Sequence, residues 1–291
     1  MLSHKPVLVR EVLNAFGCLK KGSIISDCTL GMGGHTREFL INGYRVIGID
    51  RDENALDKAK DNLKEFGNIS YARNNFIDLR KILDGLNIKA VDGILVDLGV
   101  STYQLEDDSR GFGFTGRLDM RMDTMQELTA EKIVNEYAED RISNLLFENG
   151  ERAFARKIAR RIVETRKIKR IENAEELLEI IKRCMPPRYR FSRKHHWATP
   201  TFRALRIEVN NDIGNLKSFL DSFLECLNKE GIISIISFHS IEDRIVKHKF
   251  KELAKLGKIK ILTKKPIESS ESEIKENPKE LRAKMRVAKK V

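Results

Sequence analysis

The chain has 291 residues, of which 41% are hydrophobic and 33% charged, and its formal net charge is +11. This length supports one substantial core and a smaller one, and no apolar run reaches the length of a membrane span. Residues 1–12 carry charges where a signal peptide needs an uninterrupted hydrophobic region, so we expect a cytoplasmic protein. The four cysteines form no Cys-x-x-Cys pair, so we expect neither a metal site nor a disulfide framework.

A glycine-rich segment, Cys28-Thr29-Leu30-Gly31-Met32-Gly33-Gly34-His35, follows the apolar pair Ile24-Ile25 and precedes Ile47-Gly48-Ile49-Asp50. This order predicts a strand, a turn and the start of a helix, then a second strand that ends in a carboxylate. Such a pocket suits a nucleotide cofactor, because backbone at glycine approaches a ligand closely and the acid accepts ribose hydroxyls. Thr36 stands where a dinucleotide site needs its third glycine. The cluster therefore favours a cofactor without a pyrophosphate, such as S-adenosylmethionine, although a tight surface turn is an alternative.

Later segments alternate between strand-like and helical patterns. We expect strands over residues 45–50, 69–73, 91–98 and 231–238, and a helix over Glu53 to Phe66. This alternation predicts an α/β fold with a doubly wound sheet, in which ligands bind at the carboxyl ends of the strands. Five candidate residues each end or follow a different strand, so we expect them at one edge: Gly33, Asp50, Phe76, Asp97 and His239.

The interval of over a hundred residues between the fourth and fifth of these strands is too long for one crossover helix. Helical patterns over residues 129–147, 151–165 and 173–184 predict an inserted helical domain, with Asn173 as the cap of the third helix. The chain returns to the sheet through a helix over residues 213–227. We therefore expect a sheet domain of residues 1–108 and 211–291, and an inserted domain of residues 109–210.

Basic residues gather in the predicted insertion. Residues 151–170 contain nine of them, and residues 182–203 contain seven and no acid. Clusters of this kind release counterions on meeting phosphates, so nucleic acid is the expected partner, and a solvated helix face is the alternative. The second segment also carries rings that stack on unpaired bases. These rings are Tyr189, Phe191, His195, His196 and Trp197.

Asp97 is the candidate catalytic residue. A methyl donor carried by a sulfonium needs an in-line nucleophile, and the rate comes mostly from holding the two together. The lone pair of an exocyclic base amine is delocalised into the ring, so an acceptor that pulls on an N–H group helps to free it. Asp97, at the end of the fourth predicted strand, is placed to be that acceptor. It could equally bind the amino group of the cofactor or cap the next helix.

Two segments are highly specific in combination: Leu118-Asp119-Met120-Arg121-Met122-Asp123 and Phe238-His239-Ser240-Ile241-Glu242-Asp243-Arg244. With them the chain resembles the family of small-subunit (16S) ribosomal RNA cytosine N4-methyltransferases, called RsmH or MraW. The resemblance runs nearly end to end. The other matching segments are residues 4–8, 29–35, 49–52, 92–101, 104–105, 110–112, 202–209 and 277–288.

The resemblance implies a Rossmann-like S-adenosylmethionine-dependent methyltransferase domain with an inserted helical substrate-binding domain. It implies that the substrate is a cytosine in the decoding region of the small-subunit RNA, presented within an assembled subunit. The residues that match the family's cofactor contacts are Gly33, Gly34 and His35 for the methionine end, Asp50 for the ribose, and Phe76, Asp97 and Gln104 around the rest.

The resemblance places Asp119, Arg121, His239 and Ser240 on the substrate side, although Asp119 and Arg121 could instead form a structural ion pair. The chain departs from the family at Arg117, where a proline is usual, and at Pro200, where an arginine is usual. Two other functions stay open. One is methylation of a base amine in another RNA or in DNA, and the other is a noncatalytic RNA-binding role in ribosome assembly.

Overall fold

The computed structural model describes residues 6–191, 196–269, 274 and 281–291. It divides into a sheet unit of residues 1–99 and 214–291 and a helical unit of residues 100–213. Compared with the expected boundaries, residues 100–108 and 211–213 also belong to the helical unit. At the first boundary, Asp108 is held by the loop that follows it, because its carbonyl oxygen accepts from Arg117 N–H at 3.2 Å and its Oδ1 from the Thr115 hydroxyl at 2.5 Å.

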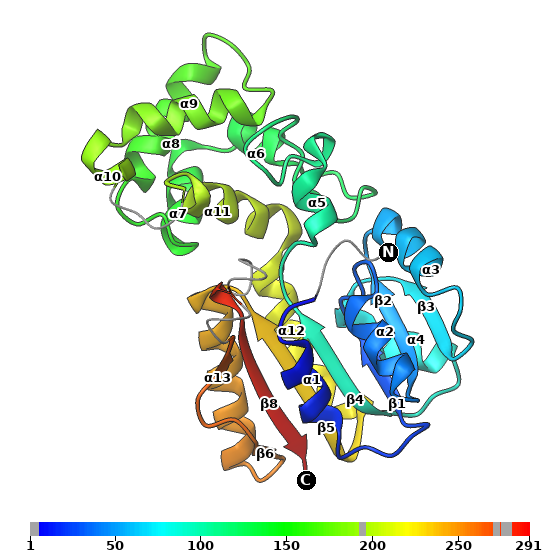
Figure 1. Cartoon of the computed structure of the whole chain (residues 1–291). Coiled ribbons are helices and arrows are strands. Elements are labelled where there is room, and N and C mark those ends of the chain that lie inside the picture. Colours follow the sequence, from blue (N-terminus) through cyan, green and yellow to red (C-terminus); the bar gives the residue numbers. More distant parts are fainter. Residues whose placement is uncertain (1–5, 192–195, 270–273, 275–280) are drawn as a thin grey trace. The chain divides into compact units, whose positions relative to one another are not determined.

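The sheet unit is built on five parallel strands with an antiparallel extension (Figure 1). The parallel strands, in spatial order, are β3 (Ile69–Arg73), β2 (Arg45–Asp50), β1 (Ile24–Asp27), β4 (Val91–Asp97) and β5 (Leu227–Ser237). On the far side of β5 lies antiparallel β8 (Lys284–Lys290), which also pairs with β6 (Ile259–Ile261) and β7 (Ile267–Glu268). The strand order reverses between β1 and β4. This Rossmann-like α/β fold confirms the predicted class, and ligands bind such sheets at the point of reversal.

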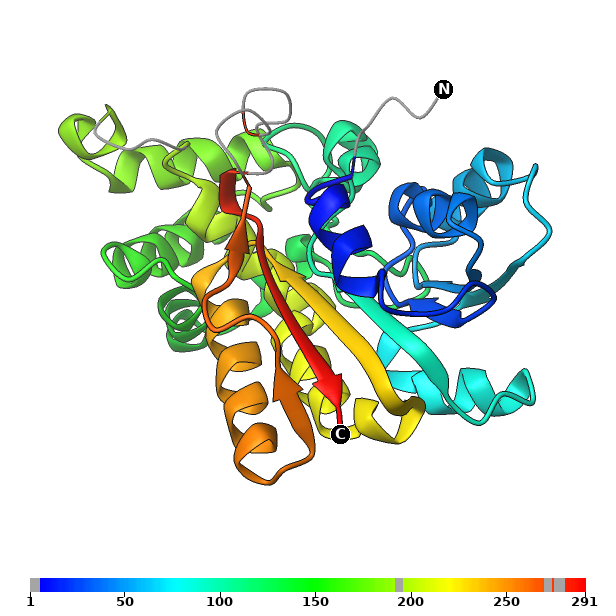
Figure 2. The same ribbon diagram turned by 60° about the horizontal axis from the view of Figure 1, so that its bottom comes forward.

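Helices cover both faces of the sheet, as Figure 2 shows. The alternation of side chains along β4 divides the core, because Ile94 and Val96 belong to one buried cluster and Leu95 to the other. The first cluster is completed by α4 (Leu79–Gly85), α12 (Asp212–Cys226) and α13 (Ser240–Lys255). The second is completed by α1 (Val9–Phe16), α2 (Gly34–Ile41) and α3 (Glu53–Asn62). With both faces covered, the carboxyl edge of the strands is left for a ligand.

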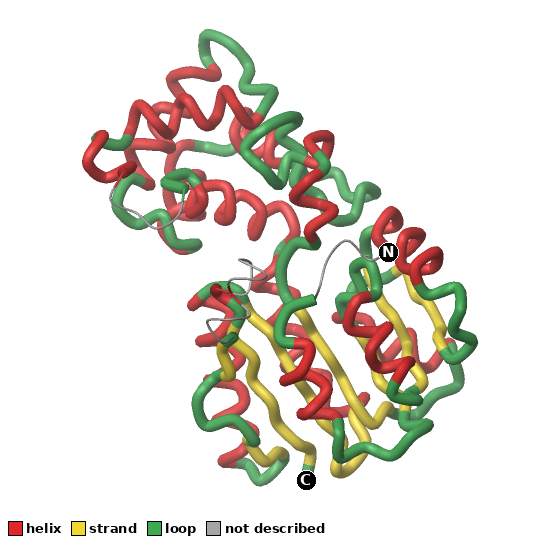
Figure 3. Tube along the Cα trace, viewed as in Figure 1, coloured by secondary structure: helices red, strands yellow, loops and turns green. Residues whose placement is uncertain are grey.

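The helical unit packs its helices around a core of its own, and Figure 3 shows it as helices joined by loops. Asn173 caps its helix as predicted, since its Oδ1 accepts from the Glu176 N–H at 2.9 Å. Within the described part of the chain, no helix has the length and apolar content to cross a bilayer. The helices are α5 (Thr102–Glu106), α6 (Ala130–Glu136), α7 (Glu139–Glu148), α8 (Ala155–Arg166), α9 (Ala174–Cys184), α10 (Pro187–Phe191) and α11 (Thr199–Asn210), with the 3-10 turn η2 (Asp108–Arg110).

The single helix expected over residues 129–147 is wrong. The chain forms α6 and α7 instead, because Tyr137 and Ala138 adopt extended backbone with ψ near 148° and 153°. Contacts with Glu208, which is distant in sequence, hold this break, since the Tyr137 hydroxyl donates to Glu208 at 3.3 Å and Arg141 Nη2 donates to it at 3.4 Å. Smaller differences are an earlier end of α3, a later start of α8 and an earlier start of β5.

Strand β8 was not predicted, because its sequence is dominated by basic residues. In the structure Met285 and Val287 are buried in the core beneath α1 and α2. The charged residue between them, Arg286, has a partner, because its Nε and Nη2 donate to the Asp243 carboxylate at 2.6 and 3.2 Å. A half-buried strand can therefore carry cations wherever a neighbouring helix supplies acids.

Candidate cofactor and substrate site

The predicted gathering of residues at one sheet edge is confirmed for the sheet unit. Asp50 ends β2 and Asp97 ends β4, while Gly33 follows β1 and Phe76 follows β3 in the 3-10 turn η1 (Phe76–Asp78). His239 follows β5. Because these five strands are parallel and adjacent, their carboxyl ends share one edge.

The glycine turn between β1 and α2 is shaped by packing as well as by openness. Gly33 has φ +84°, and a Cβ there would lie 2.6 Å from Leu63 Cδ1. A Cβ on Gly34 would lie 3.0 Å from Pro6 Cγ, a tight contact, so the chain's own packing favours glycine at both positions. Gly31 differs, because its nearest contact would be the Thr29 carbonyl oxygen at 4.0 Å. Gly31, two residues before Gly33, is therefore the glycine with open space beside its Cα, and the contacts of Gly33 and Gly34 with the cofactor stay predictions.

Asp50 is held in place by backbone donors. Its Oδ2 accepts from Gly31 N–H at 2.7 Å and its Oδ1 from Asp52 N–H at 2.9 Å. Burial raises the pKa of this carboxyl to about 6, against the opposing effect of both hydrogen bonds. Each carboxylate oxygen can accept a further hydrogen bond. Asp50 therefore has the capacity to bind two vicinal hydroxyls.

His35 and Asp97 meet where the strand order reverses. Nε2 of His35, a side chain 7% exposed, lies 3.6 Å from Asp97 Oδ2. Within the described residues, neither His35 Nε2 nor Asp97 Oδ1 has a hydrogen-bond partner. Buried polar atoms are rarely left unpaired, because each one costs about 1–3 kcal/mol. The two atoms therefore indicate a place for the polar groups of a ligand.

Asp27, which the sequence analysis did not identify, is a buried carboxylate near His35 that holds the residues on either side of the glycine turn. It is 1% exposed and accepts from the Thr36 hydroxyl at 2.7 Å and from Thr29 N–H at 3.3 Å. Burial raises the pKa of its carboxyl, and the nearby His35 opposes that effect. The sequence offered one clue, since Asp27 is a carboxylate that follows Ile24, Ile25 and Ser26 directly before the glycine-rich segment.

These features fit S-adenosylmethionine. Asp97 offers an acceptor to an ammonium group, Asp50 offers acceptors to ribose hydroxyls, and Gly31 leaves room for close approach. Phe76 is partly buried, and its ring packs edge-on against Phe219 with centroids 5.4 Å apart. Within the described residues, no group of three or more His, Cys, Asp or Glu side chains is arranged to hold a metal ion.

Gln104 belongs to the helical unit, where it stabilises the start of α5. Its side-chain Oε1 accepts from the backbone N–H of Ser101 at 2.9 Å, and the backbone N–H of Gln104 donates to Ser101 Oγ at 3.2 Å. The side chain is buried, at 4% exposure. This reciprocal pair is a capping box. The contact of Gln104 with the cofactor stays a prediction.

Asp119 and Arg121 form the ion pair that was the alternative to a substrate role. Nε and Nη2 of Arg121 donate to the two Asp119 oxygens, each at 2.8 Å. Nη1 donates to the carbonyl oxygens of Thr124 at 2.9 Å and Gln126 at 2.7 Å. The Asn210 amide then bonds the backbone on either side of Arg121. The loop is thus held by hydrogen bonds among its own residues and with Asn210, and its contact with substrate stays a prediction.

His239 caps α13. Its Nδ1 accepts from Glu242 N–H at 3.4 Å, and its Nε2 lies 2.9 Å from Glu242 Oε1. Glu242, 3% exposed, also accepts from the backbone N–H groups of Phe238 and His239. Ser240 begins the helix. Like His35 Nε2, however, His239 Nε2 has no hydrogen-bond partner among the described residues, and the contact of His239 with substrate stays a prediction.

The model of the MraW methylase family matches residues 1–291. Proteins named ribosomal RNA small subunit methyltransferase H are similar along their whole length. The chain is 48% identical to one from Sulfurihydrogenibium sp. (strain YO3AOP1) over 100% of both chains, and 45% identical to one from Pseudothermotoga lettingae over 98% of both. One from Clostridium botulinum (strain Kyoto / Type A2) is 44% identical over 99% of both. The chain belongs to the MraW methylase family. This confirms the predicted resemblance, and the family's methyl donor is S-adenosylmethionine.

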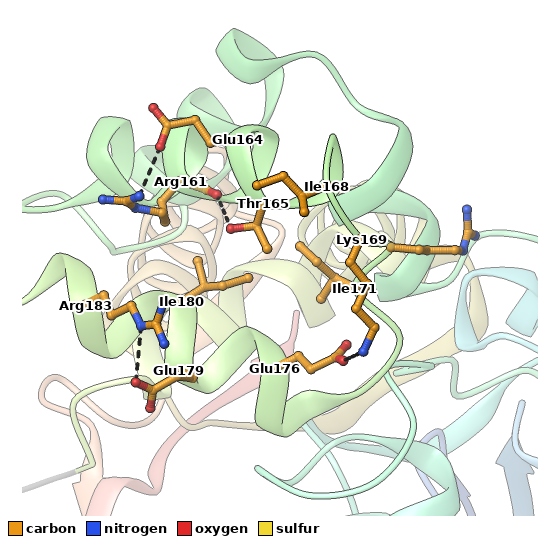
Figure 4. Close-up of a pocket in the computed structure, with 11 residues that line it drawn as sticks. Arg161, Glu164, Thr165, Ile168, Lys169, Ile171, Glu176, Glu179, Ile180 and Arg183 are labelled. Atoms are coloured by element: carbon orange, nitrogen blue, oxygen red, sulfur yellow. Dashed lines mark hydrogen bonds and ion pairs between the residues drawn. The ribbon is translucent and has the colours of Figure 1, made fainter.

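The basic residues of this methylase are less available than their number indicates. Figure 4 shows a pocket of about 390 Å³ between α8 and α9, with Ile168, Ile171 and Ile180 among its lining residues. Around it Arg161 pairs with Glu164 at 3.3 Å, and Lys169 pairs with Glu176. Arg183 pairs with Glu179 and Arg170 with Glu131. The basic residues of these segments that make no ion pair within the described chain include Arg156, Lys157, Lys167 and Arg188.

The rings of the second basic segment are also mostly engaged. His196 stacks between Phe114 and Trp197, with centroids 4.2 and 4.7 Å away, and Tyr189 packs edge-on against Phe154. Phe191 is different, because it is 84% exposed and has the Arg190 guanidinium 5.9 Å from its centroid. Arg193, Lys194 and His195 lie outside the described residues. Among the described rings of this segment, Phe191 and His196 are exposed, and Phe191 is the exposed ring that packs against no other described ring.

Proposed function

We propose that this methylase transfers a methyl group from S-adenosylmethionine to the N4 amine of a cytosine in the decoding region of 16S ribosomal RNA, within the small subunit. The observation that carries the chemistry is the pair of unpaired buried atoms, Asp97 Oδ1 and His35 Nε2, beside the glycine turn. The observation that favours the substrate is the full-length similarity to relatives named for the small-subunit RNA. The choice of the N4 amine rests on the family resemblance.

In this proposal the carboxyl edge of the sheet unit holds the cofactor, which supplies an electrophilic methyl group on sulfur. Gly33, Gly34 and His35 hold its methionine end, and Asp50 holds the ribose through the acceptor capacity left on each oxygen. The family resemblance adds Phe76 and Gln104 as further contacts of the cofactor. None of these residues needs to change its protonation state for methyl transfer, so positioning carries most of the rate.

Asp97 is the proposed catalytic residue. Its unpaired Oδ1 can accept an N–H of the cytosine amine, which makes the nitrogen lone pair more available to the methyl group. As the N–C bond would form and the C–S bond would break, the N–H proton would pass to Asp97 or to water. The same oxygen could bind the ammonium of the cofactor, and the two roles differ in what a substitution changes. A catalytic Asp97 controls kcat, whereas a binding Asp97 controls cofactor affinity.

The helical unit is the proposed RNA-binding part. Its unpaired cations include Arg156, Lys157, Lys167 and Arg188, and Phe191 offers an exposed ring for stacking. Asp119 and Arg121 would act by shaping the loop that meets the substrate, since their own polar atoms are already bonded. His239 and Ser240 would lie on the substrate side of the site, at the start of α13.

Transfer of tritium from labelled S-adenosylmethionine tests this function. The acceptors are purified small subunits that lack the modification, the same 16S RNA without proteins, and double-stranded DNA, followed by nucleoside analysis. We expect label in N4-methylcytidine from small subunits. Label in DNA or in another nucleoside would replace the proposed substrate, and binding of RNA with no label in any acceptor would favour the assembly role. Asp97→Asn is the control for transfer by a contaminating enzyme.

A further inference from the structure

The beginning of β8 lies at the same sheet edge as the candidate site. Strand β8 runs antiparallel to β5, and its first residue, Lys284, pairs with Ser237, the last residue of β5. The residues just before β8 therefore lie at the carboxyl ends of the parallel strands, next to Phe238 and His239. Figure 1 shows the red strand β8 running beside β5. Arg282 stands two residues before β8 begins.

Arg282 differs from its basic neighbours because it has no anionic partner among the residues that the structure describes. Lys284 pairs with Glu268 at 3.1 Å, and Arg286 pairs with Asp243 through two short contacts. Arg282 is half-buried, and no hydrogen bond or ion pair joins it to the described residues. Burial alone lowers the pKa of its guanidinium. A cation that loses part of its hydration without a partner costs free energy, so within the described chain this guanidinium is open to an external anion.

We propose that Arg282 binds a backbone phosphate of the RNA close to the target nucleotide, an inference that rests on the proposed function. A guanidinium presents a planar fork of donors that matches a phosphate. A phosphate contact positions the strand without reading its sequence. The chain's net charge of +11 makes a polyanion the natural ligand.

The other anion that could reach this edge is the carboxylate of the cofactor, and the strand order argues against it. In the order β1-β4-β5-β8, β8 is three positions from β1, or roughly 14 Å at about 4.8 Å per strand. The glycine turn, His35 and Asp97 all belong to β1, α2 and β4. Arg282 thus lies on the β5 side of the site, where a substrate rather than the cofactor's methionine end would approach.

The test compares Arg282→Gln with Arg45→Gln in the full-length protein. Arg45 is a matched control, because it is an exposed arginine at the start of β2, on the opposite edge of the same sheet, with no ion pair among the described residues. Binding to purified small subunits is measured by filter retention from about 50 to 200 mM KCl at fixed magnesium, and cofactor affinity by calorimetry. One phosphate contact contributes about −0.7 to the slope of log K against log salt for a single strand.

We expect Arg282→Gln to flatten that slope by about this amount, so that its affinity falls roughly threefold less than that of the wild type over the salt range. Arg282→Lys should keep the slope, and Arg45→Gln should match the wild type. Equal slopes for Arg282→Gln and Arg45→Gln would overturn the proposal. Weakened cofactor binding in Arg282→Gln would assign the residue to the cofactor carboxylate. A wild type that binds subunits with a normal slope but transfers no methyl group would refute the proposed function and leave the Arg282 contact intact.

Discussion

Two regions of this methylase contain similar side chains in opposite states. At the carboxyl edge of the sheet unit, His35 Nε2 and Asp97 Oδ1 are buried and unpaired within the described chain. In the loop of residues 118–123 in the helical unit, Nε, Nη1 and Nη2 of Arg121 all donate to oxygens of the same loop or its continuation. Since folded chains satisfy most buried polar groups, the first state indicates a ligand site and the second indicates structure. Sequence motifs alone mark both regions equally.

The largest effect that would test this contrast is expected at Asp97. Asp97→Asn should lower the rate of methyl transfer about 10²- to 10³-fold, because the amide is a poorer acceptor for the substrate N–H. Folding stability should stay within about 0.5 kcal/mol, because Oδ1 has no partner to lose. Single-turnover transfer and thermal unfolding measure the two quantities. A stability loss above 2 kcal/mol with normal transfer would mean that this edge is structural as well.

Arg121 should show the reverse. Arg121→Ala is expected to lower the free energy of unfolding by about 3 kcal/mol, because it leaves the Asp119 carboxylate and two carbonyl oxygens without their donor. Chemical denaturation followed by circular dichroism gives this value. Lys81→Ala, which removes an exposed surface ion pair with Asp78, is the control and should cost less than 1 kcal/mol. A fully stable Arg121→Ala protein with impaired RNA methylation would restore the substrate role.

The sheet edge was predictable from the sequence because its geometry is local. Strand patterns fix where Asp50 and Asp97 fall along the chain, and parallel strands bring their ends to one edge. The state of each side chain was not predictable in the same way. The surroundings of Asp97 depend on His35, which approaches its carboxylate from α2, and on Thr29, which follows β1 and accepts from its backbone N–H.

The helical unit shows why the rest escaped prediction. Periodicity favoured one helix over residues 129–147, and the break at Tyr137 depends on Glu208, which lies far along the chain. The loop of residues 118–123 is closed by Asn210 in the same manner. Strand β8 was missed because the acids that neutralise its cations, Asp243 and Glu268, belong to other elements. Long-range pairing of this kind leaves no mark in a local pattern.

Asp50 gives the next effect in size. Asp50→Ala should weaken binding of S-adenosylmethionine by about 2 kcal/mol, or roughly 30-fold, because both ribose acceptors are lost. Because burial raises its pKa to about 6 from the ordinary value of 3.8, wild-type affinity should fall as pH drops below about 6 and the carboxylate is protonated. Calorimetry between pH 5 and 8 measures both. Unchanged affinity of Asp50→Ala for the cofactor would contradict the assignment of the ribose hydroxyls to Asp50.

The raised pKa of Asp50 also has a defined effect on stability. The folded chain holds a proton that the unfolded chain releases, so ionisation of Asp50 reduces folding stability as pH rises from about 4 to about 6. Above pH 6 the full free-energy cost of the buried, ionised carboxylate remains, unless a ligand donates hydrogen bonds to it. Asp50→Asn should therefore unfold with a smaller pH dependence between pH 4 and 6 than the wild type. Identical profiles for the two proteins would contradict the buried, ionisable state of this carboxyl.

His239 should give the smallest effect and bears on both sides of the contrast. His239→Ala is expected to cost about 1 kcal/mol of folding stability, because α13 loses its cap, whereas His239→Asn keeps a capping acceptor and should lose only a few tenths. If His239 only caps the helix, His239→Asn will methylate small subunits at the wild-type kcat/KM. If it also contacts the substrate, kcat/KM will fall while the unfolding midpoint stays in place, and the start of α13 would then join the ligand-binding edge despite its internal hydrogen bonds.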